Sequence, residues 1–153
     1  MKKILFLPAL IIALAGCTQS NNPKTNEFKR NVQVETADTL CFNRFSGLEN
    51  QDTSFVKIII NGDKVLGNFS NIPNEKDARI GTITGVKSGS IIKGMWHYKQ
   101  EGMNDSIAYE FKLQDNILLQ KKTSYDVSTG REMLSDTAAF SVEFSQVDCQ
   151  SAD

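Results

Sequence analysis

The stretch Ser54–Ser70, SFVKIIINGDKVLGNFS, decides the fold. Its first part, Ser54–Ile60, is rich in β-branched and aromatic residues, which favour a strand. Asn61-Gly62 comes next, and this dipeptide between two strand-like runs is the strongest short signal for a hairpin turn. Lys64–Ser70 then has the pattern of a returning strand. The chain is therefore expected to build an antiparallel sheet through short connections.

Runs with a similar strand pattern, separated by turn residues, occupy most of the chain from residue 38 onward. They are Thr39–Phe45, Arg79–Val86, Ser90–Tyr98, Ser106–Leu113, Ile117–Lys122 and Ala138–Val147. Polar and apolar residues alternate clearly in two of them, and this predicts an antiparallel sheet with one dry face. The apolar faces consist of Ile107, Tyr109, Phe111 and Leu113 in one run, and of Ala138, Phe140, Val142 and Phe144 in the other.

One segment, Thr123–Asp136, interrupts this rhythm of strands. Its sequence, TSYDVSTGREMLSD, alternates poorly. We expect a long loop here, with a short helical turn near Thr129–Leu134.

Several glycines lie inside predicted strands rather than between them. They are Gly67, Gly81, Gly85 and Gly94. A glycine inside a strand weakens it unless the sheet must bend or another chain segment comes close, and repeated bends favour a sheet that coils into a barrel. The predicted fold class is all-β, a small antiparallel up-and-down barrel of about eight strands, lipocalin-like only by analogy of strand number. An open sandwich of similar strands is the alternative.

The N-terminal residues have the features of an export signal. Two lysines precede the apolar run Ile4–Ala15, and the run ends in Leu14-Ala15-Gly16-Cys17. This end resembles the lipobox of bacterial lipoproteins, which implies that residues 1–16 are a removed signal peptide and that Cys17 carries lipid. The run is shorter than the ~20 residues of a membrane-spanning helix, and Pro8 interrupts it. An ordinary secretory signal with a chance cysteine is the other alternative.

Residues 17–37 comprise the lipidated cysteine and a polar segment. This segment has few large apolar side chains, so we expect a flexible tether between the anchor and a domain at residues 38–150. The lipobox resemblance implies attachment to the bacterial cell envelope. By analogy with lipoprotein sorting, the absence of an acidic run after Cys17 favours the outer membrane, with the domain facing the periplasm.

The net charge of the chain bears on the class of partner that it can bind. The chain has 17 basic and 18 acidic residues, and loss of Lys2 and Lys3 with the signal changes the net charge from −1 to −3. Such a balance argues against a nucleic acid partner.

The cysteine count favours a disulfide. If lipid occupies Cys17, the cysteines that remain are Cys41 and Cys149, and an even pair in an exported protein favours a disulfide. It would join the first strand to the last.

The stretch from Cys41 to about Lys122 resembles a group of small uncharacterised lipoproteins of Bacteroidota-type bacteria. The residues that carry this resemblance are Cys41-Phe42, Glu75-Lys76-Asp77, Gly81, Gly85, Gly89, Trp96, Tyr98 and Glu101-Gly102. Ser90 stands where the group often has aspartate. The resemblance implies an envelope location and a compact β-domain, and it implies no catalytic residue.

Two groups of residues are candidates for binding. Trp96 and Tyr98 share one strand face and could contact a ligand inside the barrel, although such side chains are more often part of the core. The segment Glu75–Asp77, with Glu101, could form a polar site at a barrel mouth or a solvated loop. The single histidine, His97, lies on the opposite face from Trp96 and is expected to be exposed.

The sequence predicts no chemistry for this domain. Serine-nucleophile, phosphate-loop, dinucleotide and metalloprotease motifs are absent, and no spacing of cysteine or histidine suggests a metal site. We therefore expect a lipid-anchored, non-enzymatic envelope protein without a cofactor, bound to the membrane through Cys17. The alternatives are a barrel that binds a small apolar ligand and a structural subunit that contacts an envelope protein.

Overall fold

The computed structural model describes residues 37–151. The predicted signal peptide, Cys17 and the tether as far as residue 36 lie outside the described residues. The first strand begins at Asp38, the residue at which the domain was expected to begin.

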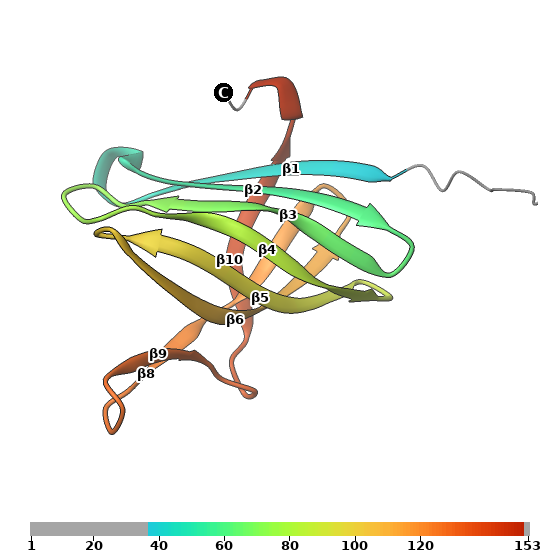
Figure 1. Cartoon of the computed structure of the whole chain (residues 1–153). Helices are drawn as coiled ribbons and strands as arrows, with labels where there is room; N and C mark the ends of the chain where they lie inside the picture. The colour runs from blue at the N-terminus through green and yellow to red at the C-terminus, as the bar shows by residue number, and fades with distance from the viewer. Residues whose placement is uncertain (1–36, 152–153) are drawn as a thin grey trace, which may run out of the picture. The chain divides into compact units, whose positions relative to one another are not determined.

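Eight antiparallel strands form a closed barrel, as predicted (Figure 1). They are β1 (Asp38–Ser46), β2 (Asp52–Asn61), β3 (Lys64–Ile72), β4 (Arg79–Ser88), β5 (Ile91–Gln100), β6 (Met103–Gln114), β7 (Ile117–Lys121) and β10 (Phe140–Val147). Neighbours follow the chain from β1 to β7, and β10 closes the barrel between β7 and β1. One-turn 3-10 helices occur at Leu48–Asn50 and Cys149–Ser151.

The hairpin predicted around Asn61-Gly62 is formed by β2 and β3. Their register runs without interruption from Thr53 opposite Ile72 to Asn61 opposite Lys64. Gly62 in the turn has a φ of 61°, a conformation that glycine adopts without strain. The predicted turn dipeptide therefore sets the register of this strand pair.

The predicted disulfide between Cys41 and Cys149 is present. Cys41 is fully buried in β1, and Cys149 lies two residues after the end of β10, which pairs with β1. The bond joins residues 108 positions apart and fastens the first strand of the barrel to the last. It therefore holds the barrel where it closes.

Aromatic and aliphatic side chains fill the middle of the barrel. Phe69 stacks on Trp96, with ring centroids 4.2 Å apart, and Phe111 and Phe144 pack edge-on against Phe69. Buried neighbours from the other strands, including Phe42, complete one continuous core. The interior is thus packed at this level and forms no open channel.

Two of the interior glycines make room for a buried tyrosine. Gly85 lies opposite Gly94, and Gly94 lies opposite Tyr109 on the next strand. A Cβ atom at Gly85 or Gly94 would lie 2.7 or 2.8 Å from the Tyr109 hydroxyl. The glycines therefore let the Tyr109 side chain approach the backbone of β4 and β5.

The predicted loop at Thr123–Asp136 is instead a second hairpin, and the helical turn expected near Thr129–Leu134 is wrong. Strands β8 (Thr123–Asp126) and β9 (Arg131–Leu134) pair over four register steps. Asp126 organises the turn by accepting hydrogen bonds from the backbone and hydroxyl of Ser128, and Gly130 has a φ of 69°. Turn chemistry rather than alternation therefore determines this element.

The last barrel strand differs in its face from the prediction. It begins at Phe140 rather than Ala138, and a bulge separates Phe140 from Val142. Phe140 lies opposite Lys121, whereas Val142 lies opposite Gln120. The bulge therefore places Phe140 on the face of Lys121, whose ammonium lies 5.4 Å from the centre of the Phe140 ring.

Candidate functional site

A belt of polar side chains lines one end of the barrel interior. We call this end the mouth; it carries the β1–β2, β3–β4 and β5–β6 connections. Every second side chain of each strand still points into the barrel here, but these inward side chains are polar rather than apolar. In β1, for example, Arg44 follows Phe42 on the inward face. Register places Arg44 opposite Ser54, Ser54 opposite Asn71, and Asn71 opposite Arg79. We call these four residues the polar belt.

A cavity of about 200 Å³ lies beside this belt. Arg44, Ser54 and Asn71 line its polar side. Its apolar side includes Trp96 and Phe144 from the top of the packed core. The space is below the roughly 300–1,000 Å³ of pockets for drug-sized ligands, so it suits only a small molecule.

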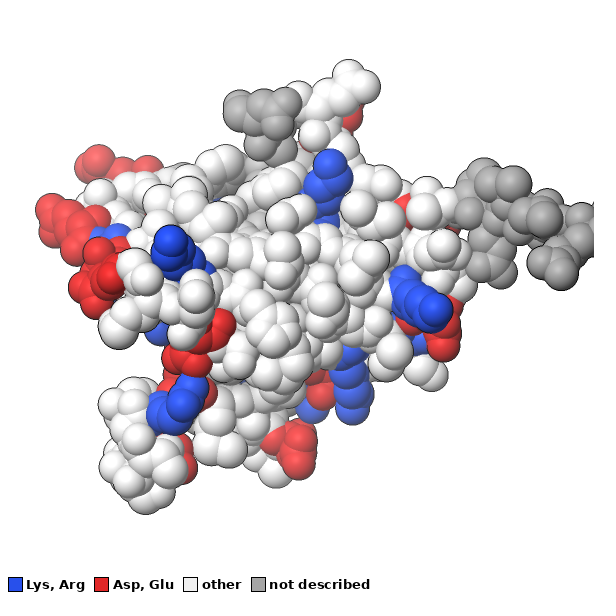
Figure 2. Space-filling model, viewed as in Figure 1, with Lys and Arg blue, Asp and Glu red and all other residues white. Residues whose placement is uncertain are grey.

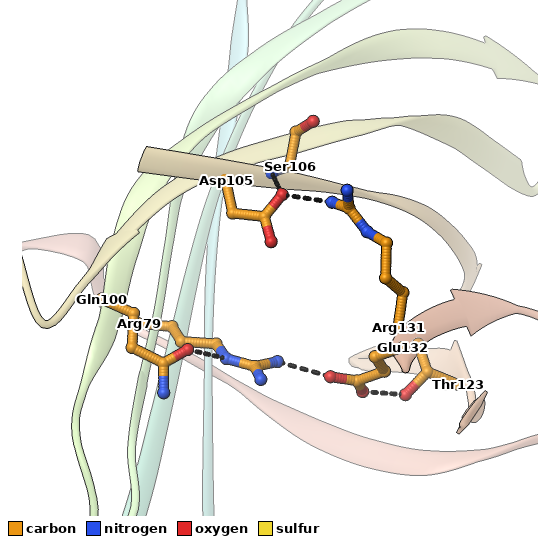
Figure 3. A network of polar contacts seen from close by, with 7 residues as sticks. All are labelled: Arg79, Gln100, Asp105, Ser106, Thr123, Arg131 and Glu132. Carbon is orange, nitrogen blue, oxygen red and sulfur yellow. Dashed lines mark hydrogen bonds and ion pairs between the residues drawn. The ribbon is translucent and has the colours of Figure 1, made fainter. Parts of the chain in front are cut away.

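The β8–β9 hairpin contributes a carboxylate to the mouth (Figure 3). Arg79 donates hydrogen bonds to Gln100 at 2.8 Å and to Glu132 of β9 at 2.5 Å. Thr123 of β8 donates its hydroxyl hydrogen to the other oxygen of Glu132. The Arg79–Glu132 ion pair is only partly exposed, with side-chain accessibilities of 27% and 34%.

The charges of this pair stabilise one another. Burial would lower the pKa of Arg79, but the hydrogen bond and negative charge of Glu132 outweigh it and raise that pKa above its usual value. Burial would raise the pKa of Glu132, but hydrogen bonds from Arg79 and Thr123 outweigh it and lower that pKa. Both groups are therefore charged at neutral pH.

A second ion pair fixes the hairpin to β6. Arg131 donates to Asp105 at 2.6 Å, and both side chains are largely exposed (Figure 3). Strand β6 pairs with β7 only from Phe111 onward, so its first half has no barrel neighbour on that side. β9 packs against β6, and Figure 1 shows the hairpin projecting from the barrel. The hairpin therefore borders the cavity where the barrel wall is incomplete.

Arg44 differs from Arg79 because no carboxylate pairs with it. Among residues 37–151, no carboxylate oxygen lies within 4.0 Å of its guanidinium. Its one hydrogen bond within this part of the chain goes to the hydroxyl of Ser46, at 2.7 Å. Ser54, its neighbour across the register, already donates to Asn71 at 3.0 Å. Arg44 thus brings an uncompensated positive charge to the cavity.

The predicted ligand contacts Trp96 and Tyr98 lie side by side, with ring centroids 4.6 Å apart, but only one of them borders the cavity. Trp96 borders the cavity, is 4% exposed, and donates its indole hydrogen to the backbone oxygen of Phe69 at 3.1 Å. Tyr98 is absent from the described lining of the cavity and lies beneath Arg79, whose guanidinium carbon is 5.1 Å from the ring centre. Burial is the main cause that raises the pKa of Tyr98. Both side chains belong to the core, and Trp96 alone also faces the cavity.

The predicted acidic group at the mouth is exposed. Glu75–Asp77 lies in the β3–β4 connection, and a hydrogen bond and negative charge from Asp77 raise the pKa of Glu101. Figure 2 shows acidic side chains gathered at this end of the barrel. His97 is exposed on the outer face, as predicted. The structure therefore joins Asp77 to Glu101 on the rim, outside the cavity.

Sequence reasoning missed the polar belt and the hairpin carboxylate. Extending the inward alternation of β1 by one step would have placed Arg44 inside the barrel, next to Phe42. The same step leads from Val56 back to Ser54 and from Phe69 on to Asn71. No comparable signal existed for Glu132, because the hairpin that carries it was expected to be a loop.

Comparisons with protein-family models, curated proteins and solved structures found no match to this chain. Within residues 37–151, no helix has the length and apolarity that crossing a membrane requires. In the same residues, no three histidine, cysteine, aspartate or glutamate side chains gather as metal ligands would.

Proposed function

We propose that this chain is a lipid-anchored protein of the bacterial cell envelope whose barrel binds a small ligand at its mouth. Lipid on Cys17 holds it to the membrane, at the periplasmic face of the outer membrane, and the barrel performs no chemistry. The observation that carries the binding function is the cavity of about 200 Å³ between the polar belt and the packed core.

The lipobox and the cysteine arithmetic support the anchor. Cys41 and Cys149 form a disulfide, which leaves Cys17 as the remaining one of the three cysteines in the sequence. The test is metabolic labelling of the full chain with an alkyne-tagged fatty acid. Wild type is expected to take up label and Cys17→Ser is not, while a Cys149→Ser control keeps it. Label on Cys17→Ser would contradict the anchor.

The contrast between a filled middle and a hollow mouth supports ligand binding. Aromatic side chains occupy the centre of the barrel, so the mouth is the part of the interior with room for a molecule. Native mass spectrometry of the full chain, purified from membranes and released from detergent, tests this. We expect a small co-purifying molecule that collisional activation removes. A chain without any such adduct would oppose the binding function.

A purely apolar ligand fits this cavity less well than a partly polar one. It would displace water from Arg44 without offering an acceptor, and removing a charged group from water without a partner is costly.

The non-enzymatic assignment is supported by the positions of the reactive side chains. Both described cysteines are disulfide-bonded, and His97 lies on the outside of the barrel.

The second candidate is a subunit that contacts an envelope protein, and one observation favours it. The β8–β9 hairpin exposes Tyr125 and Val127, which are 66% and 90% accessible. A photo-crosslinking residue at position 127 in the full chain would test this contact in intact cells. A discrete crosslinked partner, missing when the probe is placed at exposed position 82, would support it; identical products from both positions would oppose it.

A further inference from the structure

We propose that Arg44 binds the oxyanion of a small organic acid, a carboxylate or a phosphate, in the cavity at the barrel mouth. This inference rests on the proposed binding function and names the chemical class of its ligand. It concerns a residue that lies on an inward face of the barrel, next to buried Phe42.

The guanidinium of Arg44 retains most of its donors. A guanidinium carries five N–H donors in a planar fork that matches carboxylate and phosphate oxygens. Within residues 37–151, one of these five donates to a protein oxygen, that of Ser46. Half-buried and without a carboxylate, Arg44 has both the charge and the geometry to receive an oxyanion.

The other cations near the cavity are neutralised or exposed. Arg79 is paired with Glu132 at 2.5 Å. Lys121 lies 3.0 Å from Glu110, whose side chain is 8% exposed on the outer face of β6. Lys122 is exposed at the rim, on the β7 side and away from the acidic β3–β4 connection. Among residues 37–151, Arg44 and Lys122 are therefore the cavity-lining cations without a carboxylate partner, and Arg44 is the less exposed of the two.

The apolar part of the cavity lining favours an organic ligand of limited size. Trp96, Val142 and Phe144 present apolar surface there. A ligand with a charged head and a short apolar body would satisfy Arg44 and cover this surface at once. Inorganic phosphate alone would use only the head-binding half of the site.

Trp96 is the only tryptophan of the chain and borders the cavity, so its fluorescence reports on this site without background. We would titrate the full chain in detergent with butyrate, inorganic phosphate and uncharged 1-butanol. Butyrate is expected to change the fluorescence saturably, and 1-butanol at equal concentration is not. Loss of a charge-assisted hydrogen bond in Arg44→Gln should weaken butyrate binding by roughly tenfold or more.

Arg131→Gln is the matched control. It makes the same charge change at the same end of the barrel, but Arg131 is paired with exposed Asp105 and does not line the cavity. Its affinity should stay within about twofold of wild type, because exposed ion pairs contribute little. If Arg44→Gln does not fold, NMR of the arginine side chains in wild type replaces it. Butyrate should then shift the Arg44 guanidinium resonance and leave that of Arg131 unchanged.

The outcomes separate this inference from the proposed function. Saturable binding of butyrate or of phosphate that depends on Arg44 supports the oxyanion site, and the stronger probe identifies the head group. Equal binding of butyrate and 1-butanol, with Arg44→Gln like wild type, overturns the oxyanion assignment and leaves a ligand-binding mouth. No response to any probe, together with no adduct in the native mass spectrum, overturns both.

Discussion

Replacing Tyr109 with phenylalanine should stabilise the protein, because it removes a buried hydroxyl group that makes no hydrogen bond within residues 37–151. Tyr109 is 2% exposed, and its hydroxyl has no hydrogen-bond partner within residues 37–151. Gly85 and Gly94 face it without side chains, and a Cβ atom at either position would lie within 2.8 Å of the hydroxyl oxygen. Folding therefore takes this hydroxyl out of water without replacing its hydrogen bonds.

Two opposing terms set the size of this effect at neutral pH. An unpartnered buried polar group costs about 1–3 kcal/mol. Deleting the oxygen also removes a few van der Waals contacts, each contributing about 0.1–0.2 kcal/mol. The first term is larger, so Tyr109→Phe should raise the free energy of unfolding by about 1–2 kcal/mol. The melting temperature should rise by roughly 4–8 °C per kcal/mol.

Alkaline pH provides a second, independent signature of the same burial. Burial raises the pKa of Tyr109 from 10.0 to about 12 in the folded protein. Because this pKa is raised, protonated Tyr109 contributes to the free energy of unfolding. The contribution is fully present below about pH 10 and is lost as the pH rises towards about 12. The loss in wild type should be about 1.4 kcal/mol at about pH 11, from 1.36 kcal/mol per unit. Tyr109→Phe should lack this part of the loss and keep only what Tyr98, whose pKa is also raised, contributes.

Urea unfolding of the full chain, followed through Trp96 fluorescence at about pH 7 and about pH 11, measures both effects. The free-energy difference between variant and wild type should widen with pH. Destabilisation of Tyr109→Phe at neutral pH, or a difference that is the same at both pH values, would refute the reasoning. Either result would mean that the hydroxyl has a partner in the folded protein.

Three further perturbations test other parts of the fold. Alanine at both Cys41 and Cys149 should lower the free energy of unfolding by at most about 4.7 kcal/mol, the chain-entropy value for a loop of about 100 residues. In wild type, non-reducing peptide mapping should recover the two cysteines as one bonded pair, and two free thiols would contradict the disulfide. Glu132→Gln should flatten the acid limb of the stability curve, because a lowered pKa contributes stability that is lost as pH falls below the usual 4.5; parallel urea curves for variant and wild type would argue against the ion pair. Gly81→Ala should cost about 1–3 kcal/mol in urea unfolding, because its Cβ would overlap the His97 carbonyl oxygen, whereas exposed Thr82→Ala on the same strand should be near neutral; equal effects would oppose the close approach of β4 and β5.

The barrel was predictable because its signals are local. Asn61-Gly62 specifies a tight turn, and alternation in Ser106–Leu113 specifies which face is buried, so neither depends on distant parts of the chain. The Cys41–Cys149 pair followed from counting cysteines. Closure was favoured by the glycines inside strands, which suit a sheet that bends, whereas turns and alternation alone also suit an open sandwich.

The candidate site was harder to predict because its parts meet only through register. Arg44 and Asn71 are unremarkable polar residues in sequence, and only closure of the sheet places them around one cavity. Glu132 reaches the mouth through a hairpin whose strands alternate poorly and whose turn depends on Asp126. The bulge before Val142 shifts Phe140 to the other face, which alternation alone cannot anticipate.

Native mass spectrometry of the full chain extracted from membranes, in wild type and in Arg44→Gln, tests the central claim most directly. We expect a wild-type mass that corresponds to a chain beginning at lipid-modified Cys17, two hydrogens lighter for the disulfide, with a dissociable acidic adduct. Arg44→Gln should differ in covalent mass only by the replacement of arginine with glutamine, keep the lipid and the disulfide, and lack the adduct. An unprocessed chain without any adduct, or an adduct that survives Arg44→Gln unchanged, would contradict the account.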